Sequence, residues 1–132
     1  MCSVDDYLYD GETVCIGRKG TIDKPQFHSG KIWTVDTLFY TYGFKDIVPK
    51  YLYYVFTTID WKSKNEATGV PSLSKTVIEN IEFYCPNCTE QERTASILTD
   101  LDNEITSIYT EIEKIENIKS GLMDEFFNNI ID

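Results

Sequence analysis

The stretch that decides the fold runs from Thr89 to Ile115 and reads TEQERTASILTDLDNEITSIYTEIEKI. Its apolar residues recur in steps of three and four, the spacing of the a and d positions of a coiled coil. They are Leu98, Leu101, Ile105, Ile108, Ile112 and Ile115. Lys119 falls on the next a position, but Ile118, Leu122 and Phe126 continue the stripe. We predict one helix from Thr89 to about Ile131, roughly 64 Å long at 1.5 Å per residue, that pairs with another helix through these six residues.

The start of this helix carries a capping signal. Thr89 and Glu92 form a Thr-x-x-Glu capping box, and Pro86 lies just before it. Gly121, which is unfavourable inside a helix, indicates a bend or a close helix approach. Because the helix is too long to be covered by the residues before it, we expect it to project and find a partner helix. The alternative is an amphipathic helix that lies along its own domain.

The residues before this helix mix strand and helix signals. ETVCIG, residues 12–17, predicts a strand that ends at Gly17. RKGTIDKP, residues 18–25, predicts a loop, and KIWTVDTLFYTYG, residues 31–43, predicts one or two further strands. Pro49 suits the first position of a helix. That helix would place on one face the residues Leu52, Val55, Phe56 and Ile59.

The next segments complete the expected domain. KSKNEATGVPS, residues 62–72, predicts a second loop. KTVIENIEF, residues 75–83, predicts a short helical turn that leads into a strand at Ile81–Tyr84. The fold class is therefore α+β, with a small mixed α/β domain over residues 1–88 and a long coiled-coil helix over residues 89–132.

Charge is distributed unevenly along the chain. The net charge of the whole chain is −10. Residues 90–132 hold 3 basic and 11 acidic side chains, a net of −8, whereas residues 17–75 hold 9 basic and 5 acidic ones, a net of +4. A basic face before the long helix can therefore bind a polyanion although the total charge is negative.

Half of the cysteines lie in Cys85-Pro-Asn-Cys88, a Cys-x-x-Cys spacing. A structural zinc site needs two further ligands, but Cys2 and Cys15 are widely spaced and His28 is the only histidine. A thioredoxin-like thiol pair needs a surrounding βαβ pattern that the sequence lacks. We predict no metal site and interpret both cysteines as residues of a joint between the domain and the helix. With no visible signal peptide or membrane-spanning run, the expected location is the cytoplasm.

No catalytic set stands out. Asp60-Trp61-Lys62, with Asp36 upstream, has the Asp-x-Lys shape of some nucleases but lacks the other oxygen ligands that metal catalysis needs. One histidine cannot support a Ser-His-Asp arrangement, and the glycines do not form a phosphate-binding loop. These patterns predict a protein that is not an enzyme and holds no cofactor. Basic residues in loops instead favour phosphate contacts, against the alternative of an ordinary solvated surface.

Five segments follow one another in an informative order, and they are VCIGRKGTIDKPQFHSGKIWTVDTLFY, PKYLYYVF, TGVPSLSKTVIENIEF, TEQERTASILTDLDNEI and IEKIENIKSGLMDEFF. This order resembles the specificity subunit of type I restriction–modification systems. The resemblance covers roughly residues 11–128. It implies a target recognition domain that reads one half of a split double-stranded DNA target, followed by a helix that pairs antiparallel with a second helix and sets the gap between half-sites. It also implies a non-catalytic chain that docks methyltransferase and restriction subunits, which use S-adenosylmethionine, ATP and Mg.

By position, the resemblance assigns DNA contact to two loops. The implied residues are Arg18, Lys19, Thr21, Lys24, Lys62, Lys64, Asn65 and Ser72. Arg18 and the lysines are phosphate candidates, and the other three are candidates for base edges or phosphates.

Three departures from the family pattern shape the expectation. Complete subunits hold two recognition domains and two helices, whereas this chain shows one of each. The first strands of its recognition domain look missing before Met1. The sequence CPNC stands where the family has a proline-rich joint. A half subunit would form a homodimer through the long helix, so that a two-fold axis replaces the internal repeat. A coiled-coil protein-interaction adaptor without DNA binding is the alternative function.

Overall fold

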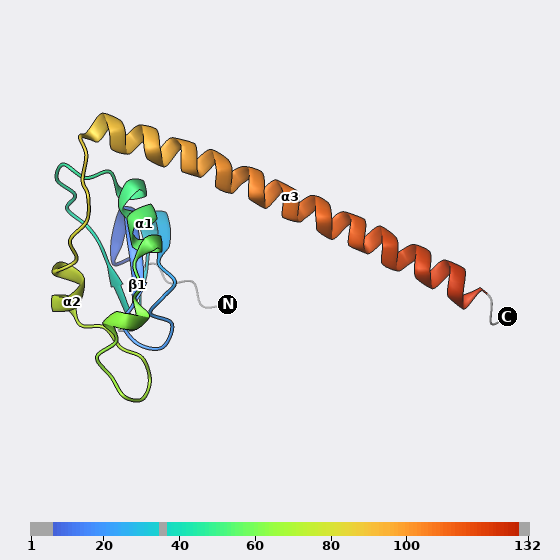
Figure 1. The fold of residues 1–132 in the computed structure, drawn as a ribbon, viewed down its shortest axis with the longest axis horizontal. Helices are drawn as coiled ribbons and strands as arrows, with labels where there is room; N and C mark the ends of the chain where they lie inside the picture. The colour runs from blue at the N-terminus through green and yellow to red at the C-terminus, as the bar shows by residue number, and fades with distance from the viewer. Residues whose placement is uncertain (1–6, 35–36, 130–132) are drawn as a thin grey trace. The chain divides into compact units, whose positions relative to one another are not determined.

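The computed structural model describes residues 7–34 and 37–129 (Figure 1). The chain divides into two compact units, with the boundary between Ala95 and Ser96. The first unit contains a small sheet, two helices and the first turns of the long helix, and the second unit contains the rest of that helix. The predicted α+β class is confirmed.

A three-stranded antiparallel sheet forms the base of the first unit. Strand β1, Tyr9–Gly17, lies between β2, Gln26–Ile32, and β3, Leu38–Tyr40. The β1–β2 register runs from Tyr9 opposite Ile32 to Cys15 opposite Gln26. The strand predicted for residues 12–17 is confirmed at its carboxyl end and begins three residues earlier than expected.

The other two strands lie partly outside the predicted range. β3 falls within residues 31–43, but β2 begins at Gln26 and includes only the first two residues of that range. The β2 side chains are exposed or half-buried, and β2 lies at the edge of the sheet. Such a strand lacks the clean alternation by which strands are found in a sequence.

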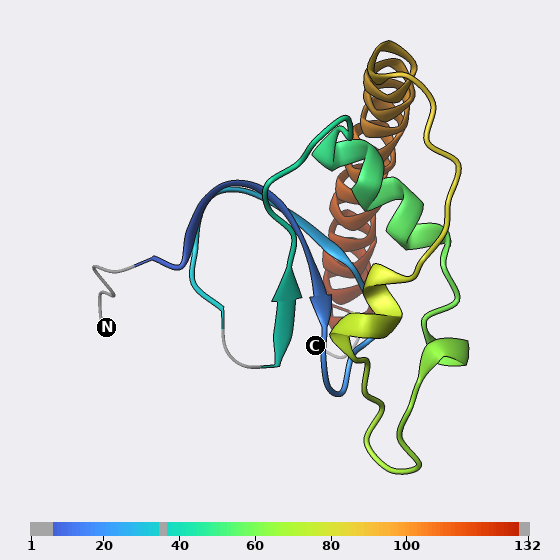
Figure 2. The same cartoon turned by 90° about the vertical axis from the view of Figure 1, so that its left-hand side faces the viewer.

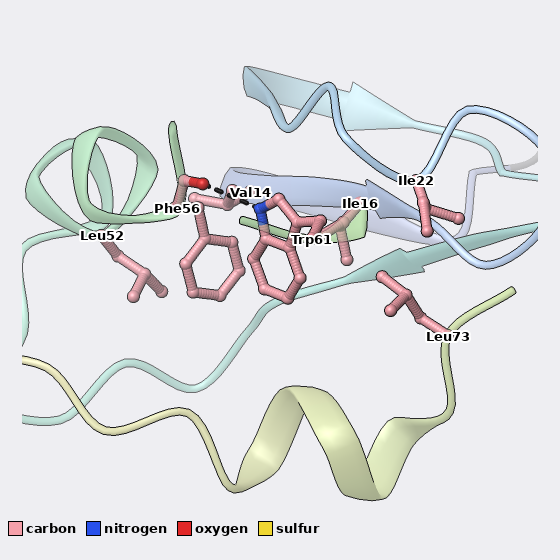
Figure 3. Packing of buried hydrophobic residues seen from close by; sticks show 7 residues of the cluster. All are labelled: Val14, Ile16, Ile22, Leu52, Phe56, Trp61 and Leu73. Atoms are coloured by element: carbon pink, nitrogen blue, oxygen red, sulfur yellow. Dashed lines mark hydrogen bonds between the residues drawn. The ribbon is translucent and has the colours of Figure 1, made fainter. Parts of the chain in front are cut away.

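Helix α1, Pro49–Thr58, begins at the predicted proline. Leu52 and Phe56 are buried, and Val55 and Ile59 pack half-buried against the core, so the predicted face is confirmed. After the helix, the chain folds Trp61 back under it (Figure 3). The Trp61 Nε1–H donates to the Phe56 carbonyl at 2.8 Å. The indole is therefore a core residue.

The core lies on one face of the sheet. Its members come from β1, from α1 and from three connecting segments, and they are Val14, Ile16, Ile22, Leu52, Phe56, Trp61 and Leu73 (Figure 3). A 3-10 turn, η1, spans Lys62–Lys64, and a short helix, α2, spans Lys75–Glu79. α1 and α2 pack over this same face, on one side of the sheet (Figure 2).

The strand predicted at Ile81–Tyr84 is wrong. Those residues follow α2 without joining a strand, and Glu82, Phe83 and Tyr84 are exposed. A strand needs a neighbouring edge for its backbone hydrogen bonds. Tyr84 instead offers its carbonyl to a side chain, since it accepts from the Tyr51 hydroxyl at 2.8 Å.

The long helix, α3, spans Cys88–Asn128. Its predicted existence is confirmed, but the predicted capping box is wrong. Thr89 lies inside the first turn, and the Asn87 side-chain oxygen accepts from the Glu90 N–H at 3.0 Å. Asn is as good an N-cap as Thr, and it lies earlier in the chain. The predicted end near Ile131 lies outside the described residues. No helix among the described residues is long and apolar enough to cross a membrane.

Candidate nucleic-acid interface

The two loops assigned to DNA contact lie side by side. We call residues 18–25 the first loop and residues 62–72 the second loop. The Gly20 N–H donates to the Pro71 carbonyl at 2.8 Å, and Lys19 and Ser72 form an isolated antiparallel bridge. Both loops lie at the lower end of the sheet in Figures 1 and 2. The fold therefore joins two segments that are about 40 residues apart in the sequence into one surface.

Buried anchors hold the first loop. Ile22 is 1% exposed and packs in the core. The chain turns so tightly after β1 that a Cβ on Gly17 would lie 2.0 Å from the Thr21 carbonyl oxygen. Only glycine fits this approach. Thr21 itself is exposed to solvent, although the backbone beside it is held in place by Gly17 and Ile22.

The second loop is closed by Asn65. The Asn65 Oδ1 accepts from the Ala67 N–H at 3.0 Å and the Ser72 N–H at 2.9 Å, while Nδ2 donates to the Ala67 carbonyl at 2.8 Å. This pattern is an Asx-type turn, in which the side chain replaces a backbone partner. Asn65 therefore shapes the loop in this structure, and its predicted contact with DNA stays a prediction.

One predicted cation is paired across the loops. The Lys62 Nζ lies 3.0 Å from the Asp23 Oδ2. This hydrogen bond holds the pKa of the Asp23 carboxyl below its usual value. The pair ties the second loop to the first and offsets the charge of Lys62. The other predicted cations are exposed side chains, and they are Arg18, Lys19, Lys24 and Lys64.

Gln91 was missed by the sequence reasoning and is fully buried in the first turn of α3. Its Oε1 accepts from the Val48 N–H at 2.8 Å. Its Nε2 lies 2.7 Å from the Pro86 carbonyl oxygen, 3.1 Å from the Asp46 carbonyl oxygen and 3.4 Å from the Cys85 Sγ. A polar residue inside a capping-box pattern is expected to be exposed. The burial of Gln91 depends on its contacts with the segments before α1 and before α3, which the sequence does not show.

The cysteines of the joint are free and exposed. Cys85 takes part in the Gln91 contacts, and Cys88 is the first residue of α3. Cys15 is buried in β1, and burial raises the pKa of its thiol. The described residues contain no group of three or more His, Cys, Asp or Glu side chains placed to hold a metal ion. Cys2 and Asp36 lie outside the described residues.

The apolar stripe of α3 is open to solvent along most of its length. Leu101, Ile105, Ile108, Ile112 and Ile115 are each 45–58% exposed, and Leu98 is half-buried. Exposed apolar residues at this regular spacing are typical of a face that is covered by another helix.

The sequence places this chain in a known class of protein. The type I restriction modification DNA specificity domain matches residues 2–117, and the chain belongs to this family. It is 31% identical over 126 residues to the type I restriction enzyme MjaVIII specificity subunit of Methanocaldococcus jannaschii, an alignment that covers 91% of this chain and 27% of that subunit.

A second relative comes from the same organism. The chain is 32% identical over 88 residues to the putative type I restriction enzyme MjaX specificity subunit, with 61% of this chain and 20% of that subunit covered. The chain thus spans about a quarter of the length of these relatives. The family predicted from the order of segments is confirmed.

Proposed function

We propose that this chain is the sequence-specific DNA recognition module of a type I restriction–modification system and reads one half of a split target. The observation that carries the proposal is the pairing of the two predicted loops into one anchored surface, in a chain that belongs to the specificity domain family. Arg18, Lys19, Lys24 and Lys64 contact phosphates, with Lys62 in exchange with Asp23. Thr21, Asn65 and Ser72 contact base edges or phosphates.

The chain has no catalytic role in this proposal. It docks a methyltransferase subunit and a restriction subunit in the cytoplasm, and those partners use S-adenosylmethionine, ATP and Mg. Residues 1–88 form the target recognition domain, and residues 89–132 form the helix that joins the assembly. The exposed stripe from Leu98 to Ile115 pairs with a second copy of the chain, so that a two-fold dimer presents two recognition domains to the two half-sites.

The test is a selection from randomised DNA duplexes at low salt, with the methyltransferase subunit present. We expect the assembly to enrich one half-target sequence. The double charge reversal Lys19→Glu/Lys24→Glu should weaken binding strongly, because each change replaces a phosphate-attracting cation with an anion. Lys45→Glu is the control, since Lys45 is also exposed but lies in neither loop, next to Asp46, whose carbonyl contacts Gln91 at the start of α3. Selection without any enriched sequence would overturn the proposal.

A second candidate function is a protein-interaction adaptor. It is favoured by the net charge of −8 in residues 90–132 and the open apolar stripe, both of which suit a helical partner better than DNA. An adaptor would self-associate through α3 and show no DNA binding. The loop charge reversal would then leave its interactions unchanged, which separates the two functions.

A further inference from the structure

A hollow of about 370 Å³ lies where the two loops meet α2. Its polar lining comes from three separate segments and comprises Arg18, Lys19, Glu66, Ser72, Ser74 and Lys75. Three of these side chains are cations and one is an anion, so the lining carries a formal charge of +2. The larger hollow beside it, which has Val14, Ile16 and Ile78 in its lining, carries only the opposite charges of Lys75 and Glu79.

The backbone fixes the two sides of this hollow. The Arg18 N–H donates to the Thr37 carbonyl at 2.7 Å, and the Arg18 carbonyl accepts from the Leu73 N–H at 2.9 Å. The Arg18 guanidinium lies 5.9 Å from the centroid of the Phe39 ring, within the range of a cation–π contact. The Arg18 backbone is therefore held between Thr37, the residue before β3, and Leu73, the residue after the second loop.

Lys75 supplies the third cation. It is the first residue of α2, directly after Ser74, whose hydroxyl accepts from the Val77 N–H at 3.3 Å and begins the helix. The Lys75 Nζ lies 3.4 Å from the Glu79 Oε1, but both side chains are more than 60% exposed. An exposed pair of this kind contributes little, so Lys75 can exchange Glu79 for another anion.

We propose that this hollow binds one backbone phosphate of the DNA, with Arg18, Lys19 and Lys75 as its cations. The proposal rests on the proposed function and assigns Lys75 to the interface. A phosphodiester suits the site because its two free oxygens can accept from several donors at once. Ser72 and Ser74 add hydroxyl groups at the rim. Such a contact fixes the position of the loops on the duplex and carries no sequence information.

The test measures binding of the assembled complex to its selected duplex over a range of salt concentrations. Lys75→Ala should weaken binding on the order of tenfold at 0.1 M salt. It should also reduce the slope of log affinity against log salt by roughly one, equally for all sequences. Lys45→Ala should change neither quantity. An unchanged affinity and slope, or an altered sequence preference, would overturn the assignment.

Glu79→Ala is the second variant. It breaks the same ion pair but leaves the cation in place, so it should retain or increase the affinity. If Lys75 acted only by stabilising α2, both variants would weaken binding alike. Replacing single phosphates of the duplex by neutral methylphosphonates adds a further readout. Replacement at one position should weaken the wild-type complex without further weakening the Lys75→Ala complex.

The wild-type complex separates the two possible failures. If it enriches no sequence and binds no duplex, the proposed function has failed. If it binds its target and Lys75→Ala binds identically, only the phosphate site has failed.

Discussion

A single buried side chain, Gln91, satisfies the backbone of two neighbouring segments. The Val48 N–H precedes α1, and the Pro86 carbonyl belongs to the joint before α3. Neither the Val48 N–H nor the Pro86 carbonyl makes a backbone hydrogen bond of a sheet or a helix. Because a buried polar group without a partner costs about 1–3 kcal/mol, the glutamine stabilises the first unit well beyond the burial of its own surface.

Gln91→Leu should therefore lower the free energy of unfolding by about 1–3 kcal/mol, since it removes the hydrogen-bond partner of two part-buried backbone groups, the Val48 N–H and the Pro86 carbonyl. Unfolding in urea, followed by the fluorescence of the buried Trp61, measures the loss. Glu92→Leu is the matched control, because Glu92 is exposed in the same turn, and it should change stability by no more than about 0.5 kcal/mol. Equal effects of both substitutions would contradict the role of Gln91.

At the scale of the element, the apolar face of α3 is largely exposed to solvent within the second unit. Its heptad stepping places Ile108 at the centre of the stripe and Thr110 away from it. A Cβ added at Gly121 would meet no heavy atom of the described residues within 4 Å, beyond its own helix backbone and chain neighbours. Of the bend or close approach predicted at this glycine, the close approach therefore has no counterpart within the described part of the single chain.

Ile108→Asp should weaken self-association at least tenfold, on the order of the cost of burying a charge in the seam between two helices. Sedimentation or light scattering over a range of protein concentrations measures the change. Thr110→Asp adds the same charge outside the stripe and should leave the oligomeric state unchanged. A monomeric wild-type chain at high concentration would contradict pairing between copies.

The elements differ in how far the sequence could predict them. α1 and α3 have strong signals, a proline at N1 in one and a sustained heptad stepping in the other. β2 was largely missed because apolar and polar residues do not alternate cleanly along this exposed strand. The strand predicted at Ile81–Tyr84 was wrong because strand propensity does not supply a neighbouring strand with which to pair. The cap was misplaced by two residues because Asn87 and Thr89 are both acceptable N-caps.

At the scale of the whole molecule, the two units differ in what holds them. The first unit has a buried core, and the two buried α3 residues, Gln91 and Ala95, both precede the boundary. Over its described residues, 96–129, the second unit is a helix without a buried side chain. Most helices in proteins depend on packing of their apolar face, so the second unit should depend on a partner and the first should not.

Removal of residues 97–132 should therefore leave the urea unfolding of the first unit within about 1 kcal/mol of its value in the full chain. The same truncation should abolish self-association. Trp61 fluorescence reports the first property and solution mass the second. A truncated chain that fails to unfold cooperatively would show that the two units form one folding unit.

The candidate interface was predictable only in part. Its loops were found from their composition and from the family resemblance. Their contact through Lys19 and Ser72, the closure by Asn65 and the pairing of Lys62 with Asp23 all depend on tertiary structure. Lys75 looked like any surface lysine until the fold placed it beside Arg18.

Ile22 in the first loop and Leu73, directly after the second loop, pack in the core, while Thr21, Lys24, Lys64 and Thr68 are exposed. At these four positions, unlike at Asn65, the side chains that face solvent are separate from those that hold the fold. Exchanging the outward residues should cost little stability, so new specificities can be reached by small steps on an unchanged frame. Under the proposed function, a library that varies the exposed Thr21 and Thr68 and keeps the phosphate candidates Lys24 and Lys64 would test a change of target.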